Sequence, residues 1–186
     1  MTNPGNSPDP RAATLARSLE TALPLFTRFL AGFDDSNRTH QAPGIPNHCA
    51  WTLGHLALYH HRTADRLLGT DEPQALPADD FVSADGRGGS PDRVDTELVC
   101  YGSTPTDDPS LYPGFDRLMQ IHDRSWQRLI DTVRSGDASM FDRAIAWGSS
   151  SFPGEQLVTR MIVHLGTHAG QICDLRRGLG MPRVIG

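Results

Sequence analysis

The chain has 186 residues, of which 38% are apolar, and its formal net charge is −5. This length fits one domain with a packed core. All 17 basic residues are arginines, which excludes mechanisms that need a lysine, such as a Schiff base or a phosphate-binding P-loop. Because no cluster of basic residues stands out along the chain, we expect no nucleic-acid partner.

The cysteines and the first residues indicate a cytoplasmic protein. Cys49, Cys100 and Cys173 are an odd number, lie far apart and form no CxxC motif, which argues against both a zinc ribbon and a disulfide framework. The first ten residues lack the charged and apolar regions of a signal peptide. No apolar run approaches the ~20 residues that a membrane-spanning helix needs. We therefore expect a cytoplasmic location and no membrane partner.

The N-terminal part predicts a short disordered tail over residues 1–8 and a single domain over 9–186. Asp9 and Pro10 suit the start of a helix, as an N-cap followed by a proline in the first turn. An apolar stripe with gaps of four and three residues predicts an amphipathic helix over 10–33. Pro24 lies inside that helix and should kink it.

A second helix is expected from the stretch HCAWTLGHLALYHHRTADRLL, with Asn47 as its N-cap and Gly69 at its end. Its first half is apolar on most sides, which predicts the most buried helix. Residues 70–111 are rich in Pro, Gly, Asp and Ser and show little periodicity. We expect a long crossover connection there, with short helices near 78–82 and 92–99.

The C-terminal half predicts two more long helices. Apolar gaps of four and three predict a third helix from Tyr112 to near Gly136, and RAIAWGSSS suggests a short extended segment. A fourth helix is expected from Pro153, ending at Gly178 or Gly180. Four such helices predict an all-α fold, a four-helix bundle with a long connection between helices two and three.

Two histidines four residues apart, His164 and His168, project from one face of the fourth helix. Such a pair could bind a metal ion, act as acid and base, or belong to the core. Two imidazole nitrogens can converge on one ion, and the buried second helix offers His55 as a third ligand. Burying three unsatisfied imidazoles would be costly, and a shared ion would satisfy them together.

The stretches WTLGHLALYHHRTADRLLG and HLGTHAGQICDLRRGLGMP resemble the DinB superfamily of metal-binding four-helix bundles. The resemblance covers the whole helix order but not residues 70–111. It implies His55, His164 and His168 as the metal ligands, open coordination positions filled by water, and a homodimer. It also implies small-molecule chemistry, since the superfamily includes transferases and isomerases that use a low-molecular-weight thiol, and some members look like hydrolases.

Two function classes follow. The first is a metal-dependent S-transferase or hydrolase acting on a small-molecule substrate, with Zn or Ni as the expected divalent ion and Fe, Mn or Co as alternatives. The second is a non-enzymatic, metal-binding, stress-associated dimer. A plain helical interaction domain would become the default if His55 lay more than about 10 Å from the other two histidines. No catalytic residue can be assigned.

Several further residues could have either a functional or a structural role. His48 could support the site or act as an acid or base, but a capping or exposed position is the simpler reading. His122 is expected to be a satisfied core histidine, and at most one of His60 and His61 should point inward. Tyr59 and Arg62 follow His55 by four and seven residues, which places them where a substrate could be touched.

The region after the histidine pair contains further polar candidates, and two cysteines lie on the helices that carry the three histidines. Gln171 lies seven residues past His164 and suits a supporting or helix-packing role. Asp174, Arg176 and Arg177 could bind an anionic group, but a solvated helix end is the simpler reading. Cys173 and Cys49 are expected to be buried.

Overall fold

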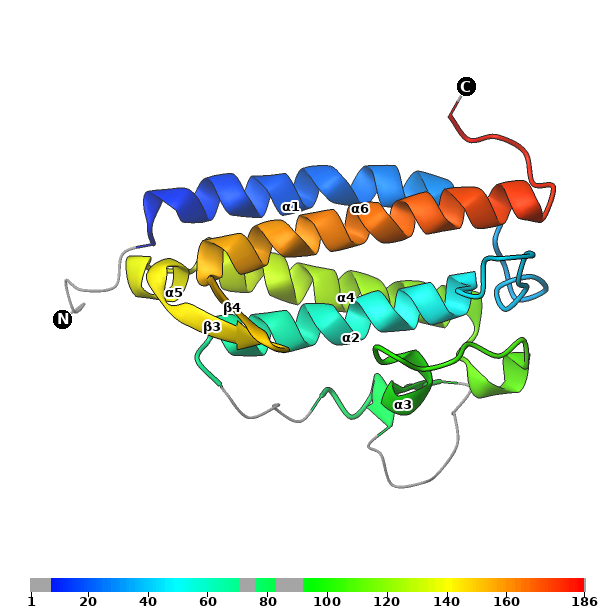
Figure 1. Ribbon diagram of the computed structural model, residues 1–186, viewed down its shortest axis with the longest axis horizontal. Helices are drawn as coiled ribbons and strands as arrows, with labels where there is room; N and C mark the ends of the chain where they lie inside the picture. The colour runs from blue at the N-terminus through cyan, green and yellow to red at the C-terminus, as the bar shows by residue number, and fades with distance from the viewer. Residues whose placement is uncertain (1–7, 71–75, 83–91, 186) are drawn as a thin grey trace.

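The structure is a computed structural model that describes residues 8–70, 76–82 and 92–185. Residues 1–7 of the expected tail, and parts of the expected connection, lie outside the described residues. The fold is mostly helical, as predicted, and four long helices lie side by side (Figure 1). They are α1 (Pro10–Phe29), α2 (Cys49–Leu67), α4 (Phe115–Arg134) and α6 (Gly154–Gly178).

The helices run in two directions. In Figure 1, α1 and α6 run one way and α2 and α4 run the other. The α2–α4 and α1–α6 pairs make the most extensive contacts, and the core lies between them. Because α2 and α4 are parallel, the chain must return along the whole bundle between them, which accounts for the long connection that the sequence predicts.

The connection contains less helix than expected. A turn leads into β1 (Phe81–Val82), which pairs in parallel with β2 (Val94–Asp95), so the helix expected near 78–82 is wrong. Only the end of the expected segment 92–99 is helical, as α3 (Thr96–Val99). Phe81 and Val94 are paired across a gap in sequence that local periodicity cannot detect. A 3₁₀ turn, Pro109–Leu111, follows before α4.

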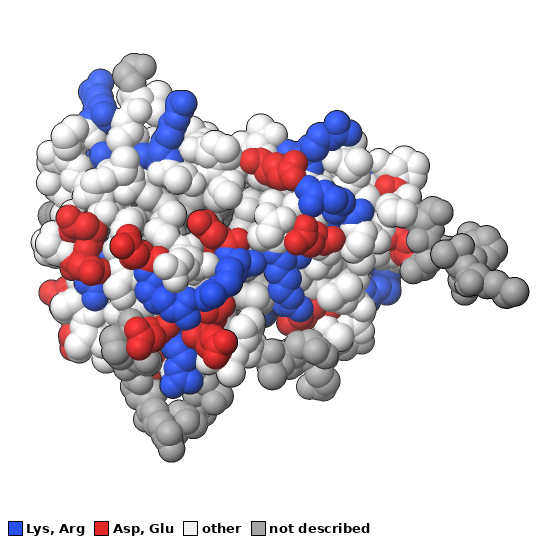
Figure 2. Space-filling model, turned by 180° about the vertical axis from the view of Figure 1, so that it is seen from behind, with Lys and Arg blue, Asp and Glu red and all other residues white. Residues whose placement is uncertain are grey.

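Buried carboxylates fasten this connection to α4. Asp80 is 3% exposed and accepts hydrogen bonds from Arg117 at 2.9 Å and from Arg124. On α2, the buried Asp65 accepts from Arg128 of α4. Figure 2 shows basic and acidic side chains interspersed over one face of the molecule. The Asp80 pairs hold the start of β1 against α4, and the Asp65 pair holds α2 against α4.

Between α4 and α6 the chain forms α5 (Ala138–Asp142), which the sequence analysis missed, and a hairpin. The extended segment expected there is confirmed: β3 (Ala144–Trp147) and β4 (Ser150–Pro153) are antiparallel. Gly148 forms the turn with φ 61°, a conformation that side chains with a Cβ rarely adopt. The hairpin places Trp147 close to Tyr59 of α2, with ring centroids 6.0 Å apart.

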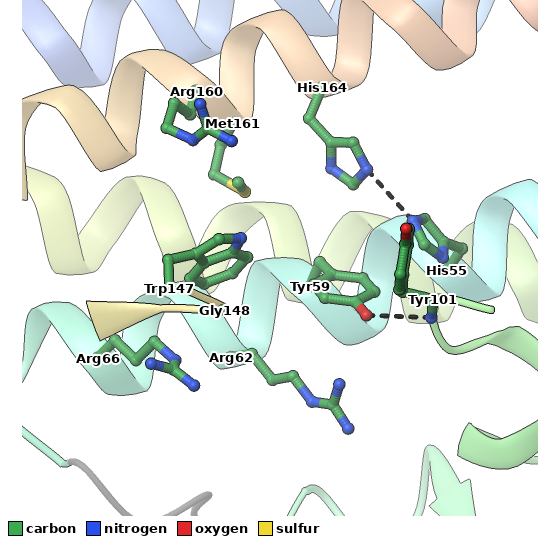
Figure 3. Close-up of a pocket in the computed structure, with 10 residues that line it drawn as sticks. All are labelled: His55, Tyr59, Arg62, Arg66, Tyr101, Trp147, Gly148, Arg160, Met161 and His164. Atoms are coloured by element: carbon green, nitrogen blue, oxygen red, sulfur yellow. Dashed lines mark hydrogen bonds between the residues drawn. The ribbon is translucent and has the colours of Figure 1, made fainter. Parts of the chain in front are cut away.

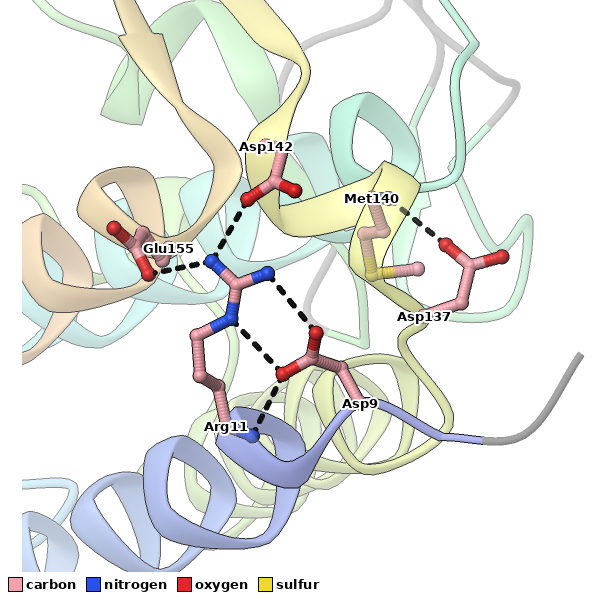
Figure 4. A network of polar contacts seen from close by, with 6 residues as sticks. All are labelled: Asp9, Arg11, Asp137, Met140, Asp142 and Glu155. Atoms are coloured by element: carbon pink, nitrogen blue, oxygen red, sulfur yellow. Dashed lines mark hydrogen bonds and ion pairs between the residues drawn. The ribbon is translucent and has the colours of Figure 1, made fainter.

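A polar network joins the start of α1 to α5 and α6 (Figure 4). Asp9 caps α1, as predicted, by accepting from the Arg11 amide at 2.8 Å. The Arg11 guanidinium also contacts Asp142 at 2.8 Å and Glu155 at 2.9 Å. This cluster holds the N-terminal end of α6 against α1.

Helix boundaries differ from the expectations by a few residues. The first helix ends at Phe29 and not at residue 33, and the third begins at Phe115 and not at Tyr112. The N-cap of α2 is His48 and not Asn47. None of the helices in the described part of the chain combines the length and apolar character needed to cross a bilayer.

Candidate metal centre

Three histidine side chains converge between α2 and α6. The Nε2 atom of His55 lies 3.2 Å from Nε2 of His164, which lies 3.0 Å from Nε2 of His168. The candidate ligand atoms all lie within 4.8 Å of one another, so the condition for a plain interaction domain, a distant His55, is not met. Ligands at about 2.0–2.1 Å from a tetrahedral ion stand roughly 3.3 Å apart. The spacing therefore fits one shared ion.

Local contacts orient two of the rings. The Nδ1–H of His55 donates to the carbonyl oxygen of Val99 at 2.7 Å. Because a carbonyl can only accept, this bond fixes the proton on Nδ1 and leaves the Nε2 lone pair facing the other histidines. Trp51 stacks on the same ring, with centroids 4.4 Å apart and an interplanar angle of 19°.

The close approach of Val99 depends on a glycine. A Cβ atom at Gly54 of α2 would lie 3.0 Å from the Val99 side chain and 3.2 Å from that of Val94. Gly54 therefore lets α3 and β2 pack tightly against α2, directly beside His55. The Gly54–His55 sequence thus has a physical basis. The missing side chain at Gly54 lets the Val99 carbonyl approach closely enough to orient His55.

His168 is oriented in a similar way from its own helix. Its Nδ1 lies 2.8 Å from Oε1 of Gln171, and the same oxygen accepts from the side-chain amide of Asn47 at 3.4 Å. Gln171 thus has the supporting role expected of it, and the ring that it orients is that of His168. By contrast, Nδ1 of His164 is buried with no hydrogen-bond partner among the described residues. One neutral His164 cannot donate from Nε2 to the Nε2 lone pairs of both His55 and His168, whereas one cation could accept the Nε2 lone pairs of all three rings.

The three imidazoles are held neutral. Burial lowers the pKa of His164 to about 4 and that of His168 to about 3, and it also lowers the pKa of His55. Nearby positive charge, Arg160 for His164 and Arg62 for His55, lowers these pKa values further. Neutral imidazole is the form that binds metal ions, so the cluster is ready to bind one at neutral pH.

A pocket opens beside the cluster (Figure 3). Its volume is about 400 Å³, and His55 and His164 form one end of it. Tyr59 and Arg62 line it, as their phase on the helix suggested. The hydroxyl of Tyr59 accepts from the Tyr101 amide at 3.1 Å, which leaves the hydroxyl proton available to a bound molecule.

Sequence reasoning missed other lining residues. Arg66 and Arg160 could have been found from helical spacing, since Arg66 lies four residues past Arg62 and Arg160 four before His164. Trp147 comes from the β3–β4 hairpin, and no local signal linked it to the histidines. Val99 could not be identified from the sequence either, because it is its backbone oxygen, not its side chain, that orients His55.

The remaining histidines lie elsewhere in the structure. His48 is buried and caps α2, accepting from the Trp51 amide at 3.1 Å while its Nε2 lies 2.9 Å from the Thr106 carbonyl oxygen. His60 and His61 are both buried, so the expectation that at most one points inward is wrong. His60 packs against His122 and Trp126 of α4, with ring centroids 5.3 and 4.6 Å away, and His61 packs against Phe81 of β1, with centroids 5.6 Å apart.

His122 and the C-terminal candidates have structural contacts. His122 is buried as predicted, but its Nε2 has no partner among the described residues, so it is not the satisfied histidine expected. Arg176 is buried and donates to backbone carbonyls, at 2.8 Å to Pro182. Arg177 pairs with Asp174 at 2.7 Å on the exposed surface. The solvated helix end expected here is confirmed for Asp174 and Arg177 and is wrong for the buried Arg176.

The two helix cysteines differ. Cys49 is fully buried, and burial raises the pKa of its thiol above the usual range. Cys173 is only partly buried, so that part of the prediction is wrong. Neither belongs to the histidine cluster.

Comparison with known proteins supports the family resemblance. A sequence model described as the DinB superfamily matches residues 18–172, which includes all three histidines of the cluster. Searches of curated proteins and of solved structures returned no match.

Proposed function

The chain belongs to the DinB superfamily, and on that premise we propose that it is a metal-dependent enzyme in which His55, His164 and His168 hold one divalent ion. The observation that carries the proposal is the convergence of three neutral Nε2 atoms, two of them oriented by hydrogen bonds from Nδ1. In this proposal the four long helices form the metal-binding four-helix bundle of the family.

The donor set guides the choice of metal. Imidazole nitrogen suits Zn, Ni, Fe or Co better than the hard cations that prefer oxygen ligands. Zn or Ni is the ion we propose for the purified protein, with Fe, Mn or Co as alternatives. Structural zinc sites generally use four protein ligands, whereas catalytic sites use three and leave room for a reactant.

When bound, such an ion would supply Lewis-acid chemistry and lower the pKa of a coordinated water or thiol. The protein's own groups do the rest. Val99 and Gln171 hold the ligand rings in place, and Tyr59 presents a hydroxyl proton to the pocket. Trp147 and Met161 provide an apolar surface against which part of a small molecule can pack.

We propose thiol-dependent S-transfer or hydrolysis as the reaction, in a cytoplasmic homodimer acting on a small molecule. The pocket directly beside the histidines favours this reading over a non-enzymatic metal-binding protein associated with stress, because a purely structural ion needs no adjoining cavity.

The test compares protein loaded with Zn or Ni, the same protein stripped with a chelator, and a His168→Ala variant. Each would be assayed for transfer of low-molecular-weight thiols to an aromatic electrophile and for ester hydrolysis. We expect turnover that is lost on stripping, restored by metal and absent from His168→Ala. Equal turnover by the metal-loaded and the metal-stripped protein would contradict the proposal. Stoichiometric metal binding without any turnover would favour the non-enzymatic alternative.

A further inference from the structure

The pocket beside the histidines contains three guanidinium groups and no carboxylate among its described lining residues. Arg62 and Arg66 come from α2, and Arg160 comes from α6 on the opposite side (Figure 3). In the described part of the chain, no acidic side chain pairs with any of the three. This contrasts with Arg11, Arg117 and Arg128, which are paired with carboxylates.

Aromatic rings hold these arginines. The Arg62 guanidinium lies 5.4 Å from the Tyr59 ring centroid, Arg66 lies 5.2 Å from that of Trp147, and Arg160 lies 4.3 Å from that of Phe152. Stacking on a ring leaves the in-plane N–H groups free to donate. Among contacts between described residues, Arg66 alone of the three donates a hydrogen bond, to the carbonyl oxygen of Ala146.

Three positive charges around one cavity repel one another, and two of them are partly removed from water, since Arg62 and Arg66 are half-buried. An anion in the pocket would relieve this repulsion and could accept paired hydrogen bonds from a guanidinium.

We propose that the pocket binds a small organic anion through Arg62, Arg66 and Arg160, its charged group being a carboxylate or a phosphate. The apolar part of this molecule packs against Trp147 and Met161, and its remaining end reaches His55 and His164. The cavity of about 400 Å³ limits it to a small molecule. The inference rests on the proposed function for its meaning as substrate recognition, but the anion site itself needs no metal.

The experiment uses the full chain stripped of metal with a chelator, so that none of the probes can be held by an ion. Three probes share a phenyl group: phenyl phosphate, phenylacetate and the neutral phenylacetamide. Binding is measured by calorimetric titration at low ionic strength, where screening is weak. At least one anion should bind about tenfold more tightly than phenylacetamide. Preference for phenyl phosphate or for phenylacetate identifies the charged group.

Arginine variants locate the binding. Arg62→Gln and Arg160→Gln should each weaken anion binding about fivefold or more, since each removes a charge-assisted donor. Arg28→Gln is the matched control, because Arg28 is an exposed arginine on α1, away from the pocket. Equal binding of neutral and anionic probes, an equal loss in Arg28→Gln, or no anion binding up to about 20 mM would overturn the proposal. Metal content of the untreated protein, measured separately, reports on the proposed function alone.

Discussion

Single residues at the histidine cluster contribute to the proposed metal site in two different ways. In the proposed metal site the three rings provide the ligand atoms, while Val99 and Gln171 orient His55 and His168 through Nδ1. Partners of this kind commonly change metal affinity by 10–100-fold when they are removed. They are therefore testable apart from the ligands themselves.

Replacing Gln171 tests this orienting role. Gln171→Ala removes the oxygen that accepts from His168, so we expect metal affinity to fall about 10–100-fold while the ligands remain. Competition with a chelating dye measures the affinity. Gln156→Ala, an exposed glutamine on the same helix, should leave it unchanged. Equal affinities for the two variants would show that Gln171 does not orient His168.

At the scale of elements, the tight packing of α3 on α2 links the crossover to the site. The backbone oxygen that orients His55 belongs to α3, and the absence of a side chain at Gly54 permits its approach. A change at Gly54 should therefore affect both stability and metal binding.

Gly54→Ala places a Cβ atom 3.0 Å from the Val99 side chain, so α3 must shift by a few tenths of an ångström. We expect a loss of about 1–3 kcal/mol in the free energy of unfolding and a weaker affinity for metal. In contrast, Gly166→Ala in α6 meets nothing within 4 Å and should gain up to about 1 kcal/mol from helix propensity.

Urea unfolding and metal titration of both variants measure these effects. A Gly54→Ala protein as stable as Gly166→Ala, with unchanged metal affinity, would rule out the packing argument. The two variants share the same chemical change, so helix propensity alone cannot account for a difference of sign.

Elements differ in how far the sequence predicts them. The four long helices follow from apolar periodicity and caps such as Asp9, because those signals are local. The helix that the sequence predicts near 78–82 is wrong, because Phe81 pairs with Val94, a contact that no local signal predicts. The His55–Val99 contact could not be predicted from local patterns either, since the two residues are 44 positions apart in the sequence.

At the scale of the molecule, buried neutral histidines couple stability to pH. Burial lowers the pKa of His48 and of His61 to about 4, and that of the fully buried His60 falls well below its ordinary value. Because the folded pKa lies below the unfolded value of about 6.5, the unfolded chain takes up protons first as pH falls. The stability these groups contribute is complete above pH 6.5 and is lost between there and pH 4.

For metal-free protein, we expect His48 and His61 each to remove about 2 kcal/mol of stability between pH 7.5 and pH 5. The three cluster histidines add to this loss in the same direction. Urea unfolding at the two pH values measures it. Equal stability at pH 7.5 and pH 5 would mean that these rings can be protonated inside the folded protein.

Some features of the whole molecule follow from residue spacing, whereas others depend on the tertiary structure. Residue spacing on two helices, together with the family resemblance, predicts that His55, His164 and His168 form one site. The structure places the three side chains together. The same spacing left His60 and His61 ambiguous, since a helix covered on nearly every side buries residues whatever their phase. The pocket needed the β3–β4 hairpin to close it, and no periodicity connects Trp147 to α2.

The most direct test of the account is the metal content of the purified protein beside its His55→Ala and His122→Ala variants, measured by elemental analysis. Both variants remove a buried histidine, but only His55 belongs to the converging cluster. We predict about one divalent ion per chain in the parent and in His122→Ala, and none in His55→Ala. Metal retained in His55→Ala, or lost from His122→Ala, would contradict the assignment of the three ligands.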